Sequence, residues 1–523
     1  MSEVRVRFAP SPTGALHIGG VRTALYNYLF AKQNNGKFIL RIEDTDSTRF
    51  VQGAEQYIIN SFKWLGIKFD EGVHIPNEKN ISYRQSERKD IYKKYVDYLL
   101  ENNLAYIAFD TPEEIEEKRK LIPNFQYDAS VRMSMNNSLT LPEETVKQKI
   151  ANKEKYVVRI LINQGRDIEI DDIICGKVIV NSSVLDDKVL WKSADGLPTY
   201  HLANVVDDHL MEITHVIRGK EWLPSAPLHV LLYEYLGWED TMPRFAHLPL
   251  ILKPDGNGKL SKRDGERLGF PVFPLVWTDP KTGIFTSGYK EIGFLPEAVI
   301  NFLALLGWNS GSEQEIFSME ELIENFSLER VNKSSAKFDY EKAKWFNHEY
   351  IQQKDNDELV QLLKDELAEN GLTFIKAEKL FDKEFIDMEI TSSEEYLRDV
   401  IGLVKERIHL LSDFYEQAYF FFIPPTSYDE TVIKKRWKKD TAEHLTKLKR
   451  IIFDTYPFNS ENIHDAIKNF VTDNDLDFGQ ILSCLRLAVT GLAKGVDICN
   501  IIEIIGFEET AKRIEKAISV IDS

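Results

Sequence analysis

Cysteine is scarce in this chain, and its few copies are scattered. The 523 residues include only Cys175, Cys484 and Cys499, without a CxxC spacing. This pattern excludes a disulfide framework and a cysteine-rich zinc site. It is typical of a reducing compartment, so we expect a cytoplasmic protein.

Long apolar runs are missing as well. The most apolar stretch, residues 418–423, is far shorter than the roughly 20 residues that cross a bilayer. The N-terminus has no basic region followed by a long apolar one, the pattern by which a signal peptide is recognised. We therefore expect neither a membrane span nor a signal peptide.

Positive charge is in deficit. The formal net charge is −18 at pH 7 and the pI is near 5.2. Taken as a sum, this balance disfavours a nucleic-acid partner. Salt screening limits the range of each surface charge's interactions to about 8 Å at physiological ionic strength, so an acidic protein can still carry a basic face. RNA binding would then be limited to patches.

The common glycine-rich nucleotide motifs, GxxxxGK[ST] and GxGxxG, are absent. Kinase-like and dinucleotide-binding interpretations therefore lose support. The length exceeds the about 250–300 residues at which single cores stop growing, which predicts several domains. A content of 43% hydrophobic and 28% charged residues is that of an ordinary globular protein.

The start of the chain alternates apolar strands with helical periods. Residues 4–8 are expected to form a buried strand, which the Pro- and Gly-containing turn at 9–14 ends. Apolar residues then recur at helical spacing over 16–29. Further elements are expected as a strand at 38–42 and helices near 55–65 and 88–102. This order predicts a parallel α/β unit.

The later patterns differ. Residues 106–190 carry short strand-like stretches between polar loops, which predicts an α+β insertion. Residues 269–288 are rich in Pro, Gly and Phe and are expected to form a surface loop. Parallel-sheet patterns return between these two segments, with apolar stretches at 199–206, 215–218 and 247–252 and a helix near 227–236. Helical periods dominate after about residue 295.

One segment near the N-terminus is typical of a phosphate site. His17 opens a helix beside Gly14, Gly19 and Gly20. A helix N-terminus presents N–H groups and partial positive charge to an anion, and glycine allows close approach. An ordinary turn with a surface histidine is the alternative for this segment taken alone.

A second segment adds cations. Lys259 and Lys262 lie in a polar loop flanked by glycines on both sides. Such a loop can close over a ligand and neutralise charge that develops on a leaving pyrophosphate. A solvated basic loop is the alternative. The two segments together favour an enzyme that holds ATP.

These segments resemble the HIGH and KMSKS signatures of the class I aminoacyl-tRNA synthetases, and the glutamyl-tRNA synthetases in particular. The resemblance spans nearly the whole chain and is looser after about residue 350. It is carried by residues 7–14, 16–20, 22–25, 41–46, 83–88, 196–203, 217–222, 294–298, 305–308 and 485–491. Gly20 stands where the signature has its last histidine, so His17 would act without it.

The resemblance implies an α/β fold: a Rossmann-like parallel-sheet catalytic domain with an α+β insertion and an all-α C-terminal region. The implied segments are 1–105 and 191–265 for the two catalytic halves, 106–190 for an acceptor-binding insertion, 266–345 for a linking helical domain and 346–523 for an anticodon-binding domain.

The implied reaction is the ATP-dependent attachment of L-glutamate to tRNA(Glu) through glutamyl-adenylate, with release of AMP and pyrophosphate. Magnesium would arrive with ATP, and the protein would be a monomer. The first step needs no general base, because a carboxylate with a pKa near 4 is ionised at pH 7. Placement and charge stabilisation must then supply the catalysis.

Roles follow residue by residue from the resemblance. His17, Lys259 and Lys262 would be catalytic. Nucleotide would be bound by Gly14, His17, Gly19, Gly20, Glu221, Trp222, Lys259 and Lys262. Glutamate would be bound by Arg7, Ala9, Ser11, Glu43, Tyr200, Asn204 and Arg218.

An arginine on the side-chain carboxylate would reject glutamine, because a bidentate charged pair is lost with an amide. Arg7 is the first choice for this role and Arg218 the second, with Glu43 holding the substrate ammonium. A structural ion pair is the alternative for each arginine. Arg7→Ala is expected to abolish glutamate activation and leave the fold intact.

A basic run in the C-terminal region is the candidate tRNA contact. It comprises Lys434, Lys435, Arg436, Lys438 and Lys439. Its alternative is a solvated helix face, and the family's use of this region for the anticodon makes phosphate contacts plausible. No structural zinc is expected, because Ala108, Asp110 and Val131 stand where some family members have cysteines.

Three other functions compete. A glutaminyl-tRNA synthetase resembles the catalytic half but tends to have a C-terminal β-barrel region. A truncated relative that glutamylates a modified tRNA base lacks an anticodon domain. The third is a nucleotidyltransferase for a small metabolite, or a non-catalytic tRNA-binding relative. Intact His17 and loop lysines argue against lost catalysis, and loss of RNA dependence would favour the metabolite enzyme. Breadth toward tRNA(Gln) stays open.

Overall fold

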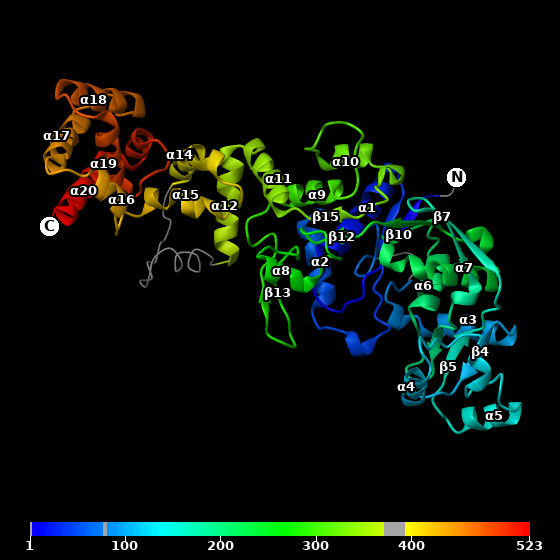
Figure 1. The fold of residues 1–523 in the computed structure, drawn as a ribbon. Coiled ribbons are helices and arrows are strands. Elements are labelled where there is room, and N and C mark those ends of the chain that lie inside the picture. Colours follow the sequence, from blue (N-terminus) through cyan, green and yellow to red (C-terminus); the bar gives the residue numbers. More distant parts are fainter. Residues whose placement is uncertain (1–2, 77–80, 371–392, 523) are drawn as a thin grey trace. The chain divides into compact units, whose positions relative to one another are not determined.

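A computed structural model describes residues 3–76, 81–370 and 393–522 (Figure 1). The chain divides into two compact units. Unit 1 comprises Met1–Glu291 and Pro296–Phe346, and unit 2 comprises Ile292–Leu295 and Asn347–Ser523. The sheets lie in unit 1, whereas the described residues of unit 2 are helical and contain no strand.

Unit 1 is built on parallel strands. Three of them are adjacent in the order β1-β2-β3, with β1 at Arg5–Phe8, β2 at Lys37–Leu40 and β3 at Glu71–Gly72. A second sheet has the order β10-β11-β6-β7, formed by His215–Gly219, Arg244–Leu248, Asp167–Asp172 and Gly176–Asn181. Thr214 donates its backbone N–H to the carbonyl of Arg5, which places β1 beside β10. The resulting order, β3-β2-β1-β10-β11-β6, is that of a Rossmann-like sheet.

Helices cover this sheet. α1 (Ile18–Gln33) packs on β1, β2 and β10 and contacts α9 (Pro296–Leu305) and α10 (Met319–Asn325). α7 (Ala226–Tyr235) packs on β6 and on α6 (Tyr200–Leu210). α2 (Ala54–Trp64) and α3 (Lys89–Glu101) match the helices expected from the apolar spacing to within one residue at each end.

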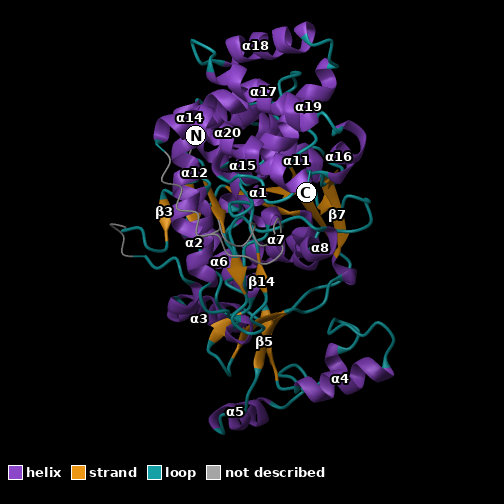
Figure 2. Ribbon diagram, turned by 90° about the vertical axis from the view of Figure 1, so that its left-hand side faces the viewer, coloured by secondary structure: helices purple, strands orange, loops and turns teal. Residues whose placement is uncertain are grey.

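The insertion contains a separate antiparallel sheet. Its order is β4-β5-β8-β9, formed by Ala105–Ala108, Val157–Ile160, Val189–Lys192 and Leu197–Pro198. α4 (Pro112–Leu121) and α5 (Glu143–Ala151) lie at the same end of unit 1 as β5 (Figure 1 and Figure 2). β6 and β7 differ from the expectation of one insertion over 106–190, because they extend the catalytic sheet at β11.

The apolar stretch at 199–206 is helical rather than extended. α6 spans it, and Leu202, Ala203, Val205 and Val206 are buried together with Asn204, Asp207 and Asp208. A short run of apolar residues cannot be assigned to a helix or to a strand by its period alone. The strand expectation for this stretch was wrong for that reason.

Residues 269–288 are only partly a surface loop. Phe270, Val272 and Phe273 are buried, and Val272 accepts the backbone N–H of Ile18 at the start of α1. The exposed part is a hairpin of β13 (Trp277–Thr278) and β14 (Phe285–Thr286). The segment therefore supports the first turn of α1.

The remaining elements of unit 1 follow the second catalytic half. α8 (Lys262–Leu268) precedes the hairpin, and β12 (Ile251–Leu252) pairs in parallel with β15 (Ala336–Lys337). α11 (Tyr340–Gln353) begins in unit 1 and ends in unit 2. The helices of unit 2 are α12 (Asn356–Asn370), α14 (Glu394–Val404), α15 (Asp413–Phe422), α16 (Glu430–Arg436), α17 (Thr441–Phe453), α18 (Ser460–Asp473), α19 (Phe478–Thr490) and α20 (Ile498–Ile521).

Candidate active site

A cavity of about 700 Å³ lies where β1 and β10 end and α1 begins. Carboxyl ends of neighbouring parallel strands meet at one edge of a sheet, which is where ligands bind in open α/β folds. All seven residues predicted to bind glutamate line this cavity: Arg7, Ala9, Ser11, Glu43, Tyr200, Asn204 and Arg218. So do six of those predicted for nucleotide: His17, Gly19, Gly20, Glu221, Trp222 and Lys259.

Two predicted nucleotide residues are not placed in the cavity lining. Gly14 lies in the turn before α1 with a φ of 130°, a backbone conformation that favours glycine. Lys262 begins α8, and its side chain lies outside the described part of the chain. The lining also includes Arg22, Thr23 and Arg49, which were not among the predicted site residues.

His17 is the N-cap of α1. Its Nδ1 accepts the backbone N–H of Gly19 at 3.0 Å. In the neutral ring this leaves the proton on Nε2, so the imidazole can donate from that atom. The Phe273 ring lies 6.5 Å from the His17 ring, edge to face.

The first backbone N–H groups of α1 were expected to be available to phosphate, but they already have acceptors within the protein. Ile18 donates its backbone N–H to Val272, Gly19 to the His17 ring, and Gly20 to the His17 carbonyl. These N–H groups already have acceptors, so the glycines serve the site mainly by being small. A Cβ on Gly20 would approach the Leu16 side chain to 2.8 Å.

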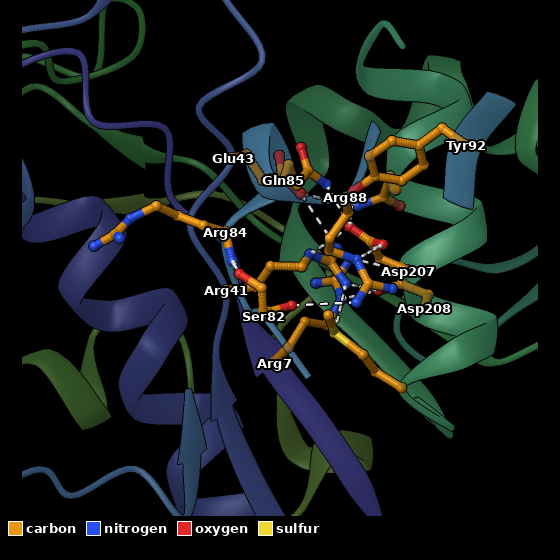
Figure 3. Close-up of polar contacts among 12 residues, drawn as sticks. Arg7, Arg41, Glu43, Ser82, Arg84, Gln85, Arg88, Tyr92, Asp207 and Asp208 are labelled. Atoms are coloured by element: carbon orange, nitrogen blue, oxygen red, sulfur yellow. Dashed lines mark hydrogen bonds and ion pairs between the residues drawn. The ribbon is translucent and has the colours of Figure 1, made fainter. Parts of the chain in front are cut away.

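A buried ionic network lies beneath the cavity (Figure 3). Asp208 accepts two hydrogen bonds from Arg7, at 3.0 and 3.1 Å, and one from Arg41 at 2.8 Å. Arg41 also donates to Glu43 at 3.2 Å. The Asn204 amide lies among Glu43, Asp208 and Arg41. These contacts fix the floor of the cavity by charge rather than by apolar packing.

A second carboxylate extends the network. Asp207 accepts from Arg88 at 2.9 Å, from Gln85 at 2.9 Å and from Tyr92 at 2.8 Å (Figure 3). Asp207 and Asp208 are adjacent on α6 and almost wholly buried. The sequence signal for them is two neighbouring acids directly after an apolar run, a pattern that does not by itself indicate a site.

The network sets the charge state of its carboxyl groups. Burial alone would raise the pKa of Asp208, but Arg7 and Arg41 hold it below its ordinary value. Burial raises the pKa of Glu43 above its ordinary value, although Arg41 and Arg7 oppose this. Glu43 is therefore a carboxylate that gains from a further cation at the cavity.

Arg218 differs from Arg7, Arg41 and Arg88, because neutral groups rather than carboxylates accept its hydrogen bonds. Its Nη1 donates to the Tyr200 hydroxyl at 2.9 Å, its Nη2 to the Trp222 carbonyl at 3.3 Å, and its Nε to the His247 ring at 3.0 Å. No carboxylate pairs with it among the described residues, and it is 5% exposed. Burial consequently lowers its pKa, the direction expected for an unbalanced cation.

Lys259 forms an ion pair with Glu221, a second residue of the cavity lining. Its Nζ is 2.5 Å from Glu221 Oε1, and both side chains are well exposed. Trp222 follows Glu221 in the chain, and its ring lies against the Tyr200 ring, with 4.4 Å between the two ring centroids. The cation is thus held by an exchangeable partner, since exposed ion pairs contribute only about 0–1 kcal/mol.

The predicted tRNA residues lie in unit 2. Lys434, Lys435 and Arg436 end α16, and Lys438 and Lys439 follow it. All five are exposed, and Lys434 pairs with Glu430 at 2.7 Å. The other four have no ion-pair partner within the residues that the structure describes.

Asp110, one of the positions where some family members have a cysteine, accepts hydrogen bonds. Asp110 accepts from the Tyr127 hydroxyl and from the backbone N–H of Asn136, both at 2.8 Å. Across residues 3–76, 81–370 and 393–522, no group of three His, Cys, Asp or Glu side chains is suited to a metal ion. The absence of structural zinc stays a prediction.

Comparison with known proteins identifies the class. The sequence profile for the catalytic domain of tRNA synthetases class I (E and Q) matches residues 3–345, and that of an anticodon binding domain matches residues 358–518. Glutamate–tRNA ligases are similar over their whole length. Those of Porphyromonas gingivalis and Phocaeicola vulgatus are each 58% identical, over 518 and 523 residues, covering at least 99% of both chains.

Solved structures agree. The crystal structure of a glutamate tRNA ligase from Elizabethkingia meningosepticum in complex with its amino acid has a TM-score of 0.90 and 48% identity, covering 99% of this chain and all of that one. The chain belongs to the class I tRNA synthetases, and within them to the glutamate–tRNA ligases. The family resemblance and the fold class inferred from the sequence are confirmed. In the described ranges, no helix is long and apolar enough to cross a membrane.

Proposed function

We propose that this chain joins L-glutamate to tRNA(Glu) in two steps driven by ATP. The α-carboxylate of glutamate attacks the α-phosphorus, which forms glutamyl-adenylate and releases pyrophosphate. A terminal ribose hydroxyl of the tRNA then takes the acyl group and releases AMP. The observation that carries this proposal is a buried arginine, Arg218, left without an anionic partner in a cavity that His17 and Lys259 also line.

Charge selects the amino acid. A buried guanidinium without a counterion gains most from a ligand carboxylate, because each charge is poorly solvated alone. Glutamine has nearly the same shape but cannot supply that charge. Tyr200 holds Arg218 from one side, and Glu43 with Asn204 would receive the substrate ammonium.

The hydrogen bonds of Arg7 and Arg218 favour Arg218 as the main partner of the glutamate side chain. Arg7 lines the cavity, yet two of its nitrogens are engaged by Asp208. Arg218 is bound by neutral groups only. We therefore assign the side-chain carboxylate of glutamate first to Arg218, with Arg7 as a neighbour that adds positive potential, in place of the opposite order taken from the sequence.

Nucleotide would occupy the part of the cavity between α1 and the 259–262 loop. His17 would donate from Nε2 to a phosphate oxygen, and Lys259 would leave Glu221 to meet pyrophosphate. Magnesium accompanying ATP would neutralise further phosphate charge. Gly14, Gly19, Gly20, Trp222 and Lys262 complete the proposed nucleotide set, and Ala9 and Ser11 complete the glutamate set.

Both the insertion and the C-terminal region would contact tRNA. The insertion would contact the acceptor end and residues 346–523 the anticodon, with Lys434, Lys435, Arg436, Lys438 and Lys439 on phosphates. A truncated base-modifying relative is disfavoured by the match to an anticodon binding domain. As a monomeric enzyme of translation, the protein would work in the cytoplasm.

Aminoacylation of purified tRNA species tests the function. Labelled glutamate should be transferred to tRNA(Glu) with ATP, and labelled glutamine should not. Arg218→Gln should abolish charging with glutamate at ordinary concentrations. Transfer of glutamine in preference to glutamate, or activation of a substrate without any need for tRNA as acceptor, would contradict the proposal.

A further inference from the structure

Three adjacent strands place a chain of side chains behind Arg218. Arg218 on β10 lies directly opposite His247 on β11 in the parallel register. Asp172, the last residue of β6, pairs with Phe245 on the same β11 strand. Neither Asp172 nor His247 lines the cavity, and both side chains are fully buried.

The hydrogen bonds through these residues run in one direction. His247 Nδ1 lies 2.6 Å from Asp172 Oδ2, and Arg218 Nε donates to His247 Nε2 at 3.0 Å. A carboxylate at Nδ1 requires the proton there, so Nε2 is left as an acceptor. Burial lowers the pKa of His247, which keeps the ring uncharged although it faces a carboxylate.

Asp172 is itself held in place. Its Oδ1 accepts the backbone N–H groups of Ile174 at 3.0 Å and of Cys175 at 2.7 Å, and both oxygens lie within 3.3 Å of the His247 backbone N. The carboxylate therefore cannot turn away from the ring without losing several charge-assisted hydrogen bonds.

A second histidine repeats the arrangement. His229 Nδ1 lies 3.3 Å from Arg218 Nη1, and burial lowers the pKa of His229 well below its ordinary value. By contrast, Arg7, Arg41 and Arg88 are all held by carboxylates. Arg218 is thus oriented by neutral acceptors at every hydrogen bond that the structure describes for it.

We propose that His247, fixed by Asp172, is a positioning residue that orients Arg218 through a neutral acceptor and so leaves the arginine's charge available to the side-chain carboxylate of the amino acid. This inference rests on the proposed role of Arg218. A carboxylate in the place of His247 would hold the guanidinium equally well but would supply the charge that the substrate is meant to supply.

A matched pair of variants separates orientation from charge. His247→Gln offers a neutral oxygen to Arg218. His247→Glu has nearly the same size and offers a carboxyl group, whose ionised form Arg218 favours and Asp172 opposes. We expect the KM for glutamate to rise about 100-fold in His247→Glu, because one buried charge pair replaces another. In His247→Gln the rise should be less than about fivefold, since a neutral acceptor remains.

The assay is aminoacylation of tRNA(Glu) by the full chain, with KM measured for glutamate and for ATP. His209→Glu is the control for adding a carboxylate, because His209 lies on α6 outside the cavity lining. The KM for ATP should change little in all three variants. A merely structural role would affect both substrates, or affect Gln and Glu variants alike, and either result would overturn the inference.

Arg218→Gln keeps the two proposals apart. If Arg218→Gln still uses glutamate normally, the proposed role of Arg218 is wrong. If it loses glutamate while His247→Glu behaves as wild type, only the positioning role fails.

If His247→Glu fails to fold, ¹⁵N NMR of histidine-labelled wild-type protein tests the inference instead. The His247 signal is assigned by its absence in His247→Gln. A neutral ring protonated at Nδ1 supports the inference when its Nε2 signal shifts on adding glutamate. An imidazolium, or a ring insensitive to glutamate, refutes it.

Discussion

Lys259 and Glu221 form an ion pair of 2.5 Å, and both residues line the cavity. The lysine predicted to meet pyrophosphate is thus bound to a residue predicted to meet the nucleotide. Exposed pairs of this kind contribute little to folding, so the pair can exchange when a triphosphate enters.

Lys259→Ala should therefore lower the rate of adenylate formation with little effect on stability. We expect kcat to fall about 100-fold, because one preorganised cation is lost from the leaving group. The KM for glutamate should stay close to that of the wild type. Stopped-flow or pyrophosphate-release kinetics with tRNA(Glu) present measure this, and a variant as fast as the wild type would exclude Lys259 from the chemistry.

Arg7→Ala should destabilise the protein, in contrast to the sequence-based expectation of an intact fold. Removing Arg7 leaves the buried Asp208 with Arg41 as its remaining arginine partner, and breaking a buried pair costs about 3–5 kcal/mol. Thermal unfolding should show a lower Tm than for Arg218→Gln, which breaks no ion pair among the described residues. Equal Tm values for the two variants would contradict this account of the network.

Acid should weaken unit 1 through its partly and fully buried histidines. Burial lowers the pKa of His215 to about 4. Between pH 6.5 and 4 the unfolded state then binds the proton that the folded state refuses, so stability is present above pH 6.5 and is lost as the pH falls. His215 is only partly buried, so it contributes about 1 kcal/mol of this loss between pH 7 and pH 5 once solvent screening is allowed for.

His215→Phe provides the comparison. A phenyl ring keeps the edge contact with Phe30, whose centroid lies 4.8 Å from the imidazole, but does not titrate. The difference in unfolding free energy between pH 7 and pH 5 should shrink in this variant. An unchanged pH dependence in urea unfolding would show that His215 is not responsible.

The charge of the C-terminal basic run can be reversed in part. Lys438→Glu combined with Lys439→Glu should weaken tRNA(Glu) binding about tenfold near 0.1 M salt and flatten the dependence of affinity on salt, because phosphate contacts release counterions. Lys447 pairs with Glu443 at 2.7 Å, so Lys447→Ala is a matched control with a smaller effect. Filter binding at several salt concentrations measures both. Equal affinities and slopes would place the tRNA elsewhere.

Much of unit 1 was predictable from short-range patterns. Strand and helix patterns predicted β1, β2, α2 and α3 to within about two residues at their ends and α1 to within about four, because each is a local run whose apolar spacing or flanking turns can be read directly. α6 was missed because its short apolar run fits a strand as well as a buried helix. The edge strands β6 and β7 were assigned to the insertion because strand pairing between distant segments leaves no local signal.

The sequence by itself determined the chemistry that is available: a capping histidine, mobile lysines and arginines at strand ends, within a recognisable family pattern. Only the tertiary structure decided which of the two predicted arginines, Arg7 or Arg218, is free to bind an anion. Asp208 balances Arg7 and neutral histidines hold Arg218, through contacts between strands and helices about 200 residues apart in one case and 29 in the other. Electrostatic balance is a property of neighbours in space, and in a buried site it depends on partners that the order of residues does not name.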